Sequence, residues 1–182
     1  MATESKATEG RTGQNNPAEK AKERIVLLLE PIEEERKRCH SFISDQSPLY
    51  DVETAASGKE ALDLFATRSY DAVVMSYQLE DMEAEEVIRS IITDNPNCPI
   101  IVTTANDSPE LAIKMLRSGA MDYLPKFGEY EKFLPRTITT NLQRSMLIEN
   151  LKDMYRRVER ASLDEALLNR LGAGRVKAFS AG

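Results

Sequence analysis

The chain has 182 residues, a hydrophobic share of 41% and a formal net charge of −6. This length fits one compact domain with appendages or at most two small domains, and the negative charge argues against nucleic-acid binding as the main activity. No apolar run approaches the roughly 20 residues that span a bilayer, and no secretory signal opens the sequence, so we expect no membrane anchor. Cys39 and Cys98 form neither a CxxC motif nor a disulfide framework, which favours a reducing cytoplasm.

The first segment, residues 1–22, is rich in Thr, Glu, Lys, Gly, Gln and Asn and has no hydrophobic period. Such a composition cannot bury enough apolar surface to offset the entropy lost on ordering. We therefore expect a disordered tail ahead of the first structural element.

Short apolar runs alternate with segments of helical period over residues 23–142. Unbroken apolar runs are typical of strands buried on both faces, as in a parallel sheet that helices cover. The predicted strands are Ile25–Leu29, Tyr50–Ala55, Ala72–Met75, Ile100–Thr103 and Met121–Leu124. Five strands that alternate with helices predict a doubly wound α/β domain.

Helix signals lie between these strands. Ser57 and Glu60 form a capping box, and Ser108 followed by Pro109 resembles an N-cap and first helical residue, with Gly119 as the stop. Two buried stripes at helical spacing are also predicted. They comprise Ala84, Val87, Ile88, Ile91 and Ile92, and, more weakly, Ile32, Cys39, Phe42 and Ile43.

A helical extension is predicted for residues 143–172. Its apolar residues alternate in steps of four and three, as in a heptad seam, and they are Leu147, Leu151, Met154, Val158 and Ala161. Two heptads are marginal alone, so this helix either forms a short coiled coil or folds back on its own domain. We expect it to end at Gly172 and a flexible tail to occupy residues 173–182.

Polar side chains follow four of the predicted strands. In an open doubly wound sheet, ligands bind at the carboxyl ends of the strands. An acid, two hydroxyls and an ammonium should therefore meet in one crevice, and they are Glu30, Ser76, Thr104 and Lys126. Such a set could hold an anion, because Thr104 can donate a hydrogen bond and Lys126 supplies charge.

The chain from Arg24 to about Leu142 resembles a response-regulator receiver domain of the CheY-like type. The motifs that carry the resemblance are Tyr70–Ala84, Pro99–Ala105, Gly119–Lys126 and Phe133–Arg136. The resemblance implies a flavodoxin-like sheet with strand order 2-1-3-4-5.

The resemblance also implies a role for each crevice residue. Ser76 stands at the position of the phosphoacceptor aspartate, and Glu30 is the remaining acid of the acidic pocket. Thr104 corresponds to the switch hydroxyl, Tyr123 to the switch aromatic residue and Lys126 to the phosphate-binding lysine.

The sequence departs from the receiver pattern at the chemical centre. Receivers place two adjacent acids after the first strand to hold Mg²⁺ with the phosphoacceptor, and here these positions are Leu29 and Glu30. Mg²⁺ requires near-octahedral oxygen ligands, so one glutamate and a serine hydroxyl should bind it poorly. A serine hydroxyl without a histidine base is also a weak nucleophile. We expect a degenerate pseudo-receiver with a lost or weak Mg²⁺ site, no other cofactor and no enzymatic activity.

Each of these residues also has a plainer interpretation. Ser76 either fills a vacated pocket or is the target of a serine kinase. Lys126 either forms a structural ion pair with Glu30 or binds an anion. Thr104 and Tyr123 are either strand residues with local partners or parts of a switch.

These expectations favour a two-component, phosphorelay-type signalling module in the cytoplasm that acts through contacts with signalling proteins. A homodimer would form through the C-terminal helix or through the face of the fourth helix, fifth strand and fifth helix. One alternative is an N-terminal regulatory fragment of a receiver-output enzyme of the diguanylate cyclase or kinase type. A nucleic-acid-binding regulator is the third hypothesis, and it is disfavoured because basic residues in the last 40 residues are interleaved with acids.

Overall fold

A five-stranded parallel sheet forms the centre of the molecule. The computed structural model describes residues 24–46, 49–106 and 108–179, with side chains through residue 167. The sheet order is β2-β1-β3-β4-β5, which confirms the predicted topology. The strands are β1 (Arg24–Leu29), β2 (Tyr50–Ala55), β3 (Ala72–Ser76), β4 (Ile100–Thr104) and β5 (Asp122–Pro125).

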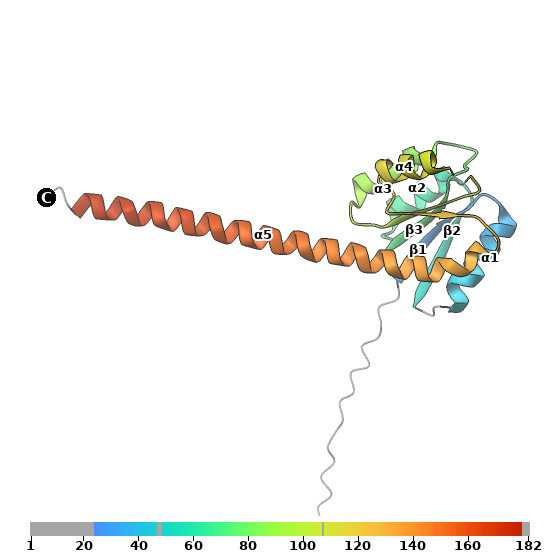
Figure 1. Ribbon diagram of the computed structural model, residues 1–182, viewed down its shortest axis with the longest axis horizontal. Coiled ribbons are helices and arrows are strands. Elements are labelled where there is room, and N and C mark those ends of the chain that lie inside the picture. The colour runs from blue at the N-terminus through green and yellow to red at the C-terminus, as the bar shows by residue number, and fades with distance from the viewer. Residues whose placement is uncertain (1–23, 47–48, 107, 180–182) are drawn as a thin grey trace, which may run out of the picture.

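Helices cover both faces of this sheet (Figure 1). On one face lie α2 (Gly58–Thr67), α3 (Ala84–Asp94) and α4 (Pro109–Ser118), and on the other lie α1 (Glu33–Gln46) and α5 (Leu134–Phe179). A short 3₁₀ helix, η1 (Tyr130–Phe133), leads into α5. Successive strand residues point to opposite faces, so Leu27 packs on the α2–α4 side and Leu28 packs on the α1–α5 side.

The predicted helix caps are confirmed. The Ser57 hydroxyl accepts a hydrogen bond from the backbone N–H of Glu60, and the Ser108 hydroxyl accepts one from the N–H of Leu111. Gly119 ends α4 with φ = 109°, a backbone conformation that favours glycine. The caps at Ser57 and Ser108 end the loops that follow β2 and β4 at the carboxyl ends of the strands, whereas Gly119 begins the connection from α4 to β5.

Gly119→Ala is expected to destabilise the domain by about 2–4 kcal/mol, because it combines backbone strain with overpacking. A Cβ at this position would lie 2.1 Å from Ile92 Cδ1. Gly128→Ala is the matched control, since Gly128 also has a positive φ, 55°, but a Cβ there meets nothing within 4 Å. Urea denaturation should show a loss of about 1 kcal/mol for the control, and equal losses for the two variants would contradict the steric account.

Helix α5 continues past Gly172, where we expected it to end, and it reaches Phe179. A glycine inside a helix costs only about 1 kcal/mol relative to alanine and does not by itself end the helix. The helix packs on the domain through its first turns and then projects away from it (Figure 1). The tail expected at residues 1–22 lies outside the described residues. Of the tail expected at residues 173–182, residues 173–179 belong to α5 and the rest lie outside the described residues.

In the described part of the chain, no helix is both long enough and apolar enough to cross a membrane.

Candidate functional site

Three of the predicted crevice residues meet at the carboxyl ends of the strands. Glu30 directly follows β1, Ser76 ends β3, and Lys126 directly follows β5. The side chains of Glu30 and Lys126 are only 2% and 8% exposed, and Ser76 is also buried. The parallel topology alone brings these groups together, as predicted.

The Lys126 ammonium has three acceptors. Its Nζ lies 2.7 Å from Glu30 Oε2, 2.7 Å from Glu35 Oε2 and 3.3 Å from Ser76 Oγ. A lysine ammonium carries three N–H donors, so these three partners satisfy it completely. The predicted contact of Lys126 with Glu30 is therefore present, but it is one part of a larger cluster.

Glu35 and Tyr130 also belong to this cluster, although the sequence did not predict them as site residues. Glu35 lies in the first turn of α1, and its Oε2 also accepts a hydrogen bond from the Tyr130 hydroxyl at 3.3 Å. The Lys126 Nζ lies 5.9 Å from the centroid of the Tyr130 ring, within the range of a cation–π contact. The Tyr130 hydroxyl lies 3.4 Å from Cys39 Sγ, so the network continues into the buried face of α1.

The charges of the cluster support one another. Burial would lower the pKa of the Lys126 ammonium, but the hydrogen bonds and charges of Glu30 and Glu35 outweigh burial and raise this pKa. Lys126 is therefore protonated at neutral pH and cannot act as a general base toward the Ser76 hydroxyl. Burial raises the pKa of the Tyr130 hydroxyl, so this group stays neutral.

The contribution of Glu35 to stability should be lost in acid. Burial would raise the pKa of its carboxyl, but the Lys126 hydrogen bond, the Lys126 charge and the Tyr130 hydrogen bond outweigh burial and lower it from 4.5. The unfolded chain therefore binds the proton of this carboxyl more tightly than the folded chain does. The stabilisation is complete above the pKa of the carboxyl in the unfolded state and is lost as the pH falls through its pKa in the folded state.

Urea denaturation of the wild type and Glu35→Gln across pH should reveal this dependence. The wild type is expected to have the higher free energy of unfolding at neutral pH, and the two values should converge as the pH falls well below about 4.5. A difference that stays constant down to the acid end would show that the Glu35 charge does not contribute to the ion pair.

Thr104 and Tyr123 have local partners in the loop after β4. The Thr104 hydroxyl accepts hydrogen bonds from Gln78 Nε2 at 3.2 Å and from the Asn106 backbone N–H at 3.1 Å. The Tyr123 hydroxyl donates to the Asn106 carbonyl at 2.6 Å. Both side chains therefore hold the start of the β4–α4 loop, and the Thr104 hydroxyl is engaged by this loop and by the β3–α3 loop.

The residues at the crevice do not fit an Mg²⁺ ion. Leu29 is fully buried in the core on the α2–α4 face and offers no oxygen ligand from its side chain. Glu30 Oε2 is bound by Lys126, and Glu30 Oε1 accepts from the Ile32 backbone N–H at 3.1 Å. Within the described ranges, no three His, Cys, Asp or Glu residues are grouped so that they could hold a metal. A cation at this point would compete with the Lys126 ammonium for the same carboxylates.

The acidic segment after β3 is also used structurally. Both carboxylate oxygens of Asp81 accept backbone N–H groups at the start of α2, from Gly58 at 3.0 Å and from Lys59 at 2.8 Å. Glu85, in the first turn of α3, is 8% exposed and forms an ion pair with Lys114 of α4. These contacts hold the β3–α3 loop beside the crevice.

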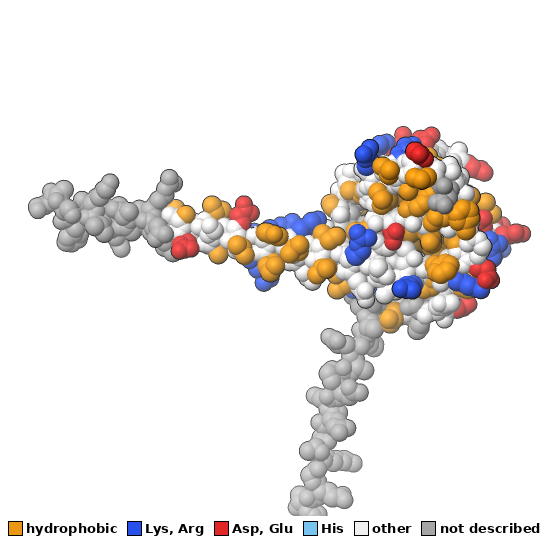
Figure 2. Space-filling view, viewed as in Figure 1, with side chains coloured by type: hydrophobic (Ala, Val, Ile, Leu, Met, Phe, Trp, Pro, Cys, Tyr) orange, Lys and Arg blue, Asp and Glu red, His pale blue; other side chains and the backbone are white. Residues whose placement is uncertain are grey.

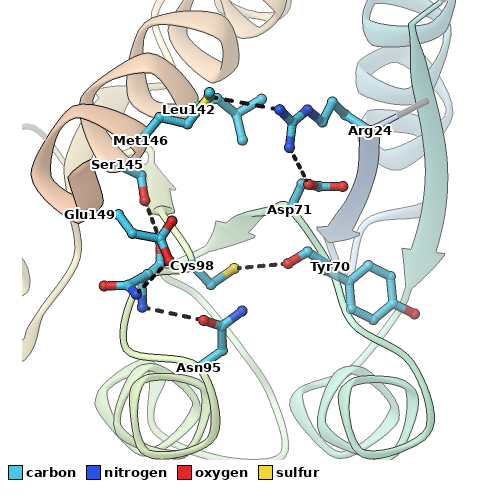
Figure 3. Close-up of a pocket in the computed structure, with 10 residues that line it drawn as sticks. Arg24, Tyr70, Asp71, Asn95, Cys98, Leu142, Ser145, Met146 and Glu149 are labelled. Carbon is cyan, nitrogen blue, oxygen red and sulfur yellow. Dashed lines mark hydrogen bonds and ion pairs between the residues drawn. The ribbon is translucent and has the colours of Figure 1, made fainter. Parts of the chain in front are cut away.

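A cavity lies at the opposite end of the sheet, between α5 and the loop before β4 (Figure 3). Arg24 Nη1 donates to Asp71 Oδ1 at 2.7 Å, and Ser145 of α5 donates to the Asn97 carbonyl. Lys152 Nζ donates to Asn97 Oδ1 at 3.1 Å. The bonds from Ser145 and Lys152 of α5 to Asn97 fix the direction in which α5 leaves the domain.

The two cysteines are free and buried. Burial raises the pKa of the Cys39 thiol to about 11 and that of the Cys98 thiol to about 12. Both are therefore thiols at neutral pH, and neither has the character of a reactive thiolate.

The chain is similar to known proteins over its central part. Residues 26–137 match the family model of the response regulator receiver domain. The chain is 41% identical over 87 residues to the response regulator MprA of Mycolicibacterium vanbaalenii, a match that covers 48% of this chain and 38% of MprA. It is 33% identical over 101 residues to the transcriptional regulatory protein ZraR of Klebsiella oxytoca, covering 56% of this chain and 23% of ZraR. The chain thus spans well under half the length of these curated relatives.

The solved structures agree with this match. The receiver domain of the Francisella response regulator 1452 superposes with a TM-score of 0.60 at 26% identity, over 67% of this chain and 98% of that one. NtrX from Brucella abortus superposes with a TM-score of 0.65 at 19% identity, over 72% of this chain and 29% of NtrX, which shows the shared fold. Because the family model covers more than half of its residues, this chain belongs to the response regulator receiver domain family.

Proposed function

We propose that this chain is a pseudo-receiver, a two-component signalling module that works through protein contacts without phosphorylation at the phosphoacceptor position. One observation carries the proposal: the Lys126 ammonium is fully hydrogen-bonded by the protein's own Glu30, Glu35 and Ser76. A phosphate-binding lysine that is already satisfied has no donor to offer a phosphoryl group. The module is accordingly a binding protein and not an enzyme.

The chemistry of Ser76 supports this proposal. Phosphoryl transfer depends on a metal that neutralises the developing charge. Of the three positions at which receivers carry metal-binding carboxylates, here Leu29, Glu30 and Ser76, only Glu30 is an acid. A serine hydroxyl also requires a base to become a good nucleophile. Lys126, which donates to the Ser76 hydroxyl, has a raised pKa and keeps its proton. His40, the single histidine, lies on α1 and forms no part of the cluster around Ser76.

The exposed stripe of α5 supplies a surface for a second copy of the chain. Leu147, Leu151, Met154 and Val158 are 69%, 47%, 57% and 62% exposed, and Figure 2 shows hydrophobic side chains along the part of α5 that leaves the domain. Ile138 and Leu142 pack on the domain, and at about 100° per residue the stripe lies on the opposite side of the helix. A second helix can therefore dock without displacing the domain, as a heptad seam requires.

A second surface is available for signalling partners. Ile113 and Leu116 of α4 are 51% and 49% exposed, and Tyr123 of the neighbouring strand β5 anchors the β4–α4 loop beside them. Exposed apolar side chains on one face are typical of protein-binding sites. We propose this face, made by α4, β5 and α5, as the place where partners bind.

Incubation with acetyl phosphate and Mg²⁺ tests the proposal. Intact-mass spectrometry should find the wild type unmodified, as it should find Ser76→Ala, while a receiver domain with a phosphoacceptor aspartate gains a phosphoryl group under the same conditions. A stable mass increase that the wild type shows and Ser76→Ala lacks would exclude a phosphorylation-independent module.

A further inference from the structure

We infer that Glu35 is an internal anionic ligand whose carboxylate occupies the place of an oxyanion on Lys126 and keeps the pocket closed to phosphate-like ligands. The inference rests on the proposed function, because it explains how the pocket is held in one state without phosphorylation. It concerns α1, an element outside the residues at the strand ends that form the rest of the pocket.

The hydrogen-bond count is the first line of support. Glu30 and Ser76 leave one N–H of the Lys126 ammonium without a partner, and Glu35 Oε2 takes it at 2.7 Å. The Tyr130 hydroxyl donates to the same oxygen at 3.3 Å. A carboxylate oxygen that accepts one charged and one neutral donor is held as a bound oxyanion would be.

The charge of the pocket is the second line of support. Two carboxylates, Glu30 and Glu35, face one ammonium, so the cluster carries a net charge of about −1 while the ordinary charge states hold. An incoming phosphate would meet repulsion as well as a satisfied lysine. With Glu35 absent, the cluster has no net charge and Lys126 regains a donor. With a neutral side chain at this position the net charge is also removed, although an oxygen remains that can accept from Lys126.

The position of Glu35 on α1 is the third line of support. Glu33, Glu34 and Glu35 form a run of acids in the first turn, where negative charge suits the helix dipole at any of them. Only Glu35 lies four and eight residues before the buried Cys39 and Ile43, on the helix stripe that faces the sheet. Glu34 is exposed. Packing of α1 therefore directs one acid of the three into the pocket.

Phosphate binding by the intact chain tests this inference. Inorganic phosphate is titrated into the wild type, Glu35→Ala and Glu34→Ala, and binding is followed by backbone amide shifts at the strand ends. Glu35→Ala should bind phosphate about tenfold more tightly than the wild type, or better, because a charged competitor is removed. Glu34→Ala removes the same charge from the same helix turn and should bind no better than the wild type.

Two further variants complete the experiment. Glu35→Gln keeps the size of the side chain and should show a gain in the same direction, so a folding defect of Glu35→Ala cannot hide the result. The double variant Glu35→Ala/Lys126→Met should lose the gain. Equal phosphate affinity of the wild type and both Glu35 variants, or an equal gain in Glu34→Ala, would overturn the inference. Failure of this inference would not overturn the proposed function as long as Ser76 stays unphosphorylated. Labelling of Ser76 by a phosphodonor would overturn the proposed function whatever Glu35 does.

Discussion

Lys126→Met is expected to destabilise the domain by about 3–5 kcal/mol, because it leaves buried carboxylates without their counter-charge. Glu30 is 2% exposed and makes its closest side-chain contact with the lost ammonium. Glu35 loses the partner that lowers its pKa. Methionine matches the lysine stem in length, so the loss reports the charge and not a cavity. Urea denaturation at neutral pH measures the effect.

Lys132→Met is the matched control for this variant. Lys132 also pairs with a glutamate, Glu129, but its side chain is 48% exposed and that of Glu129 is 73% exposed. Exposed ion pairs contribute about 0–1 kcal/mol, so the control should unfold almost as the wild type does. The double variant Lys126→Met/Glu30→Gln should cost less than the sum of its two single variants, because both partners of the buried pair are removed together. A Lys126→Met variant as stable as the control would refute the buried cluster as a source of stability.

Leu151→Asp/Val158→Asp is expected to abolish self-association of the chain. Both side chains lie on the exposed stripe of α5, and aspartates at the centre of a helical seam would face each other across it. The wild type should show a concentration-dependent mass that approaches twice that of one chain, since two heptads give a weak interface. Multi-angle light scattering over a dilution series measures the molar mass of the wild type and of the double variant.

Leu163→Asp is the control for the seam. Leu163 is 64% exposed on the same helix, and at about 100° per residue it lies away from the line through Leu151 and Val158. The control should associate as the wild type does. A wild type that stays monomeric at every concentration would contradict the seam, and equal losses in the two variants would indicate a nonspecific apolar contact.

The sequence predicted the parts of the molecule that depend on topology and periodicity. Apolar runs such as Ile25–Leu29 indicated buried parallel strands, and the ends of parallel strands necessarily meet at one edge of the sheet. Glu30, Ser76 and Lys126 could therefore be placed together without coordinates. The caps at Ser57 and Ser108 could be predicted because a serine hydroxyl accepts a hydrogen bond from a backbone N–H group that has no partner within the first turn of the helix.

The sequence did not predict the parts that depend on the rotation of α1. Ile32 was assigned to the buried stripe of the first helix, but it precedes α1 and is 55% exposed. That assignment hid Glu35, whose inward direction follows only when the stripe is read backward in steps of four from Ile43 and Cys39. Tyr130 was missed because the short η1 helix has no periodic signal.

Thr104 shows a further limit of the strand-end argument. The side chain is fully buried where predicted, but its hydroxyl accepts bonds from Gln78 and from the Asn106 backbone. The sheet topology determines where the Cα atom of a strand-end residue lies, whereas the loops that follow the strands determine which groups its side chain contacts. The roles of Thr104 and Tyr123 in switching stay predictions.

The most direct measurement of the central claim is the ¹⁵N–¹H NMR signal of the Lys126 ammonium in the intact chain. A buried ammonium with three internal acceptors should give a signal that is protected from exchange, absent in Lys126→Met and shifted in Glu35→Gln. Adding inorganic phosphate and Mg²⁺ to the wild type should leave this signal unchanged. An ammonium that exchanges freely, or whose signal moves on adding phosphate and Mg²⁺, would show that Lys126 is available to an outside ligand and would contradict the account.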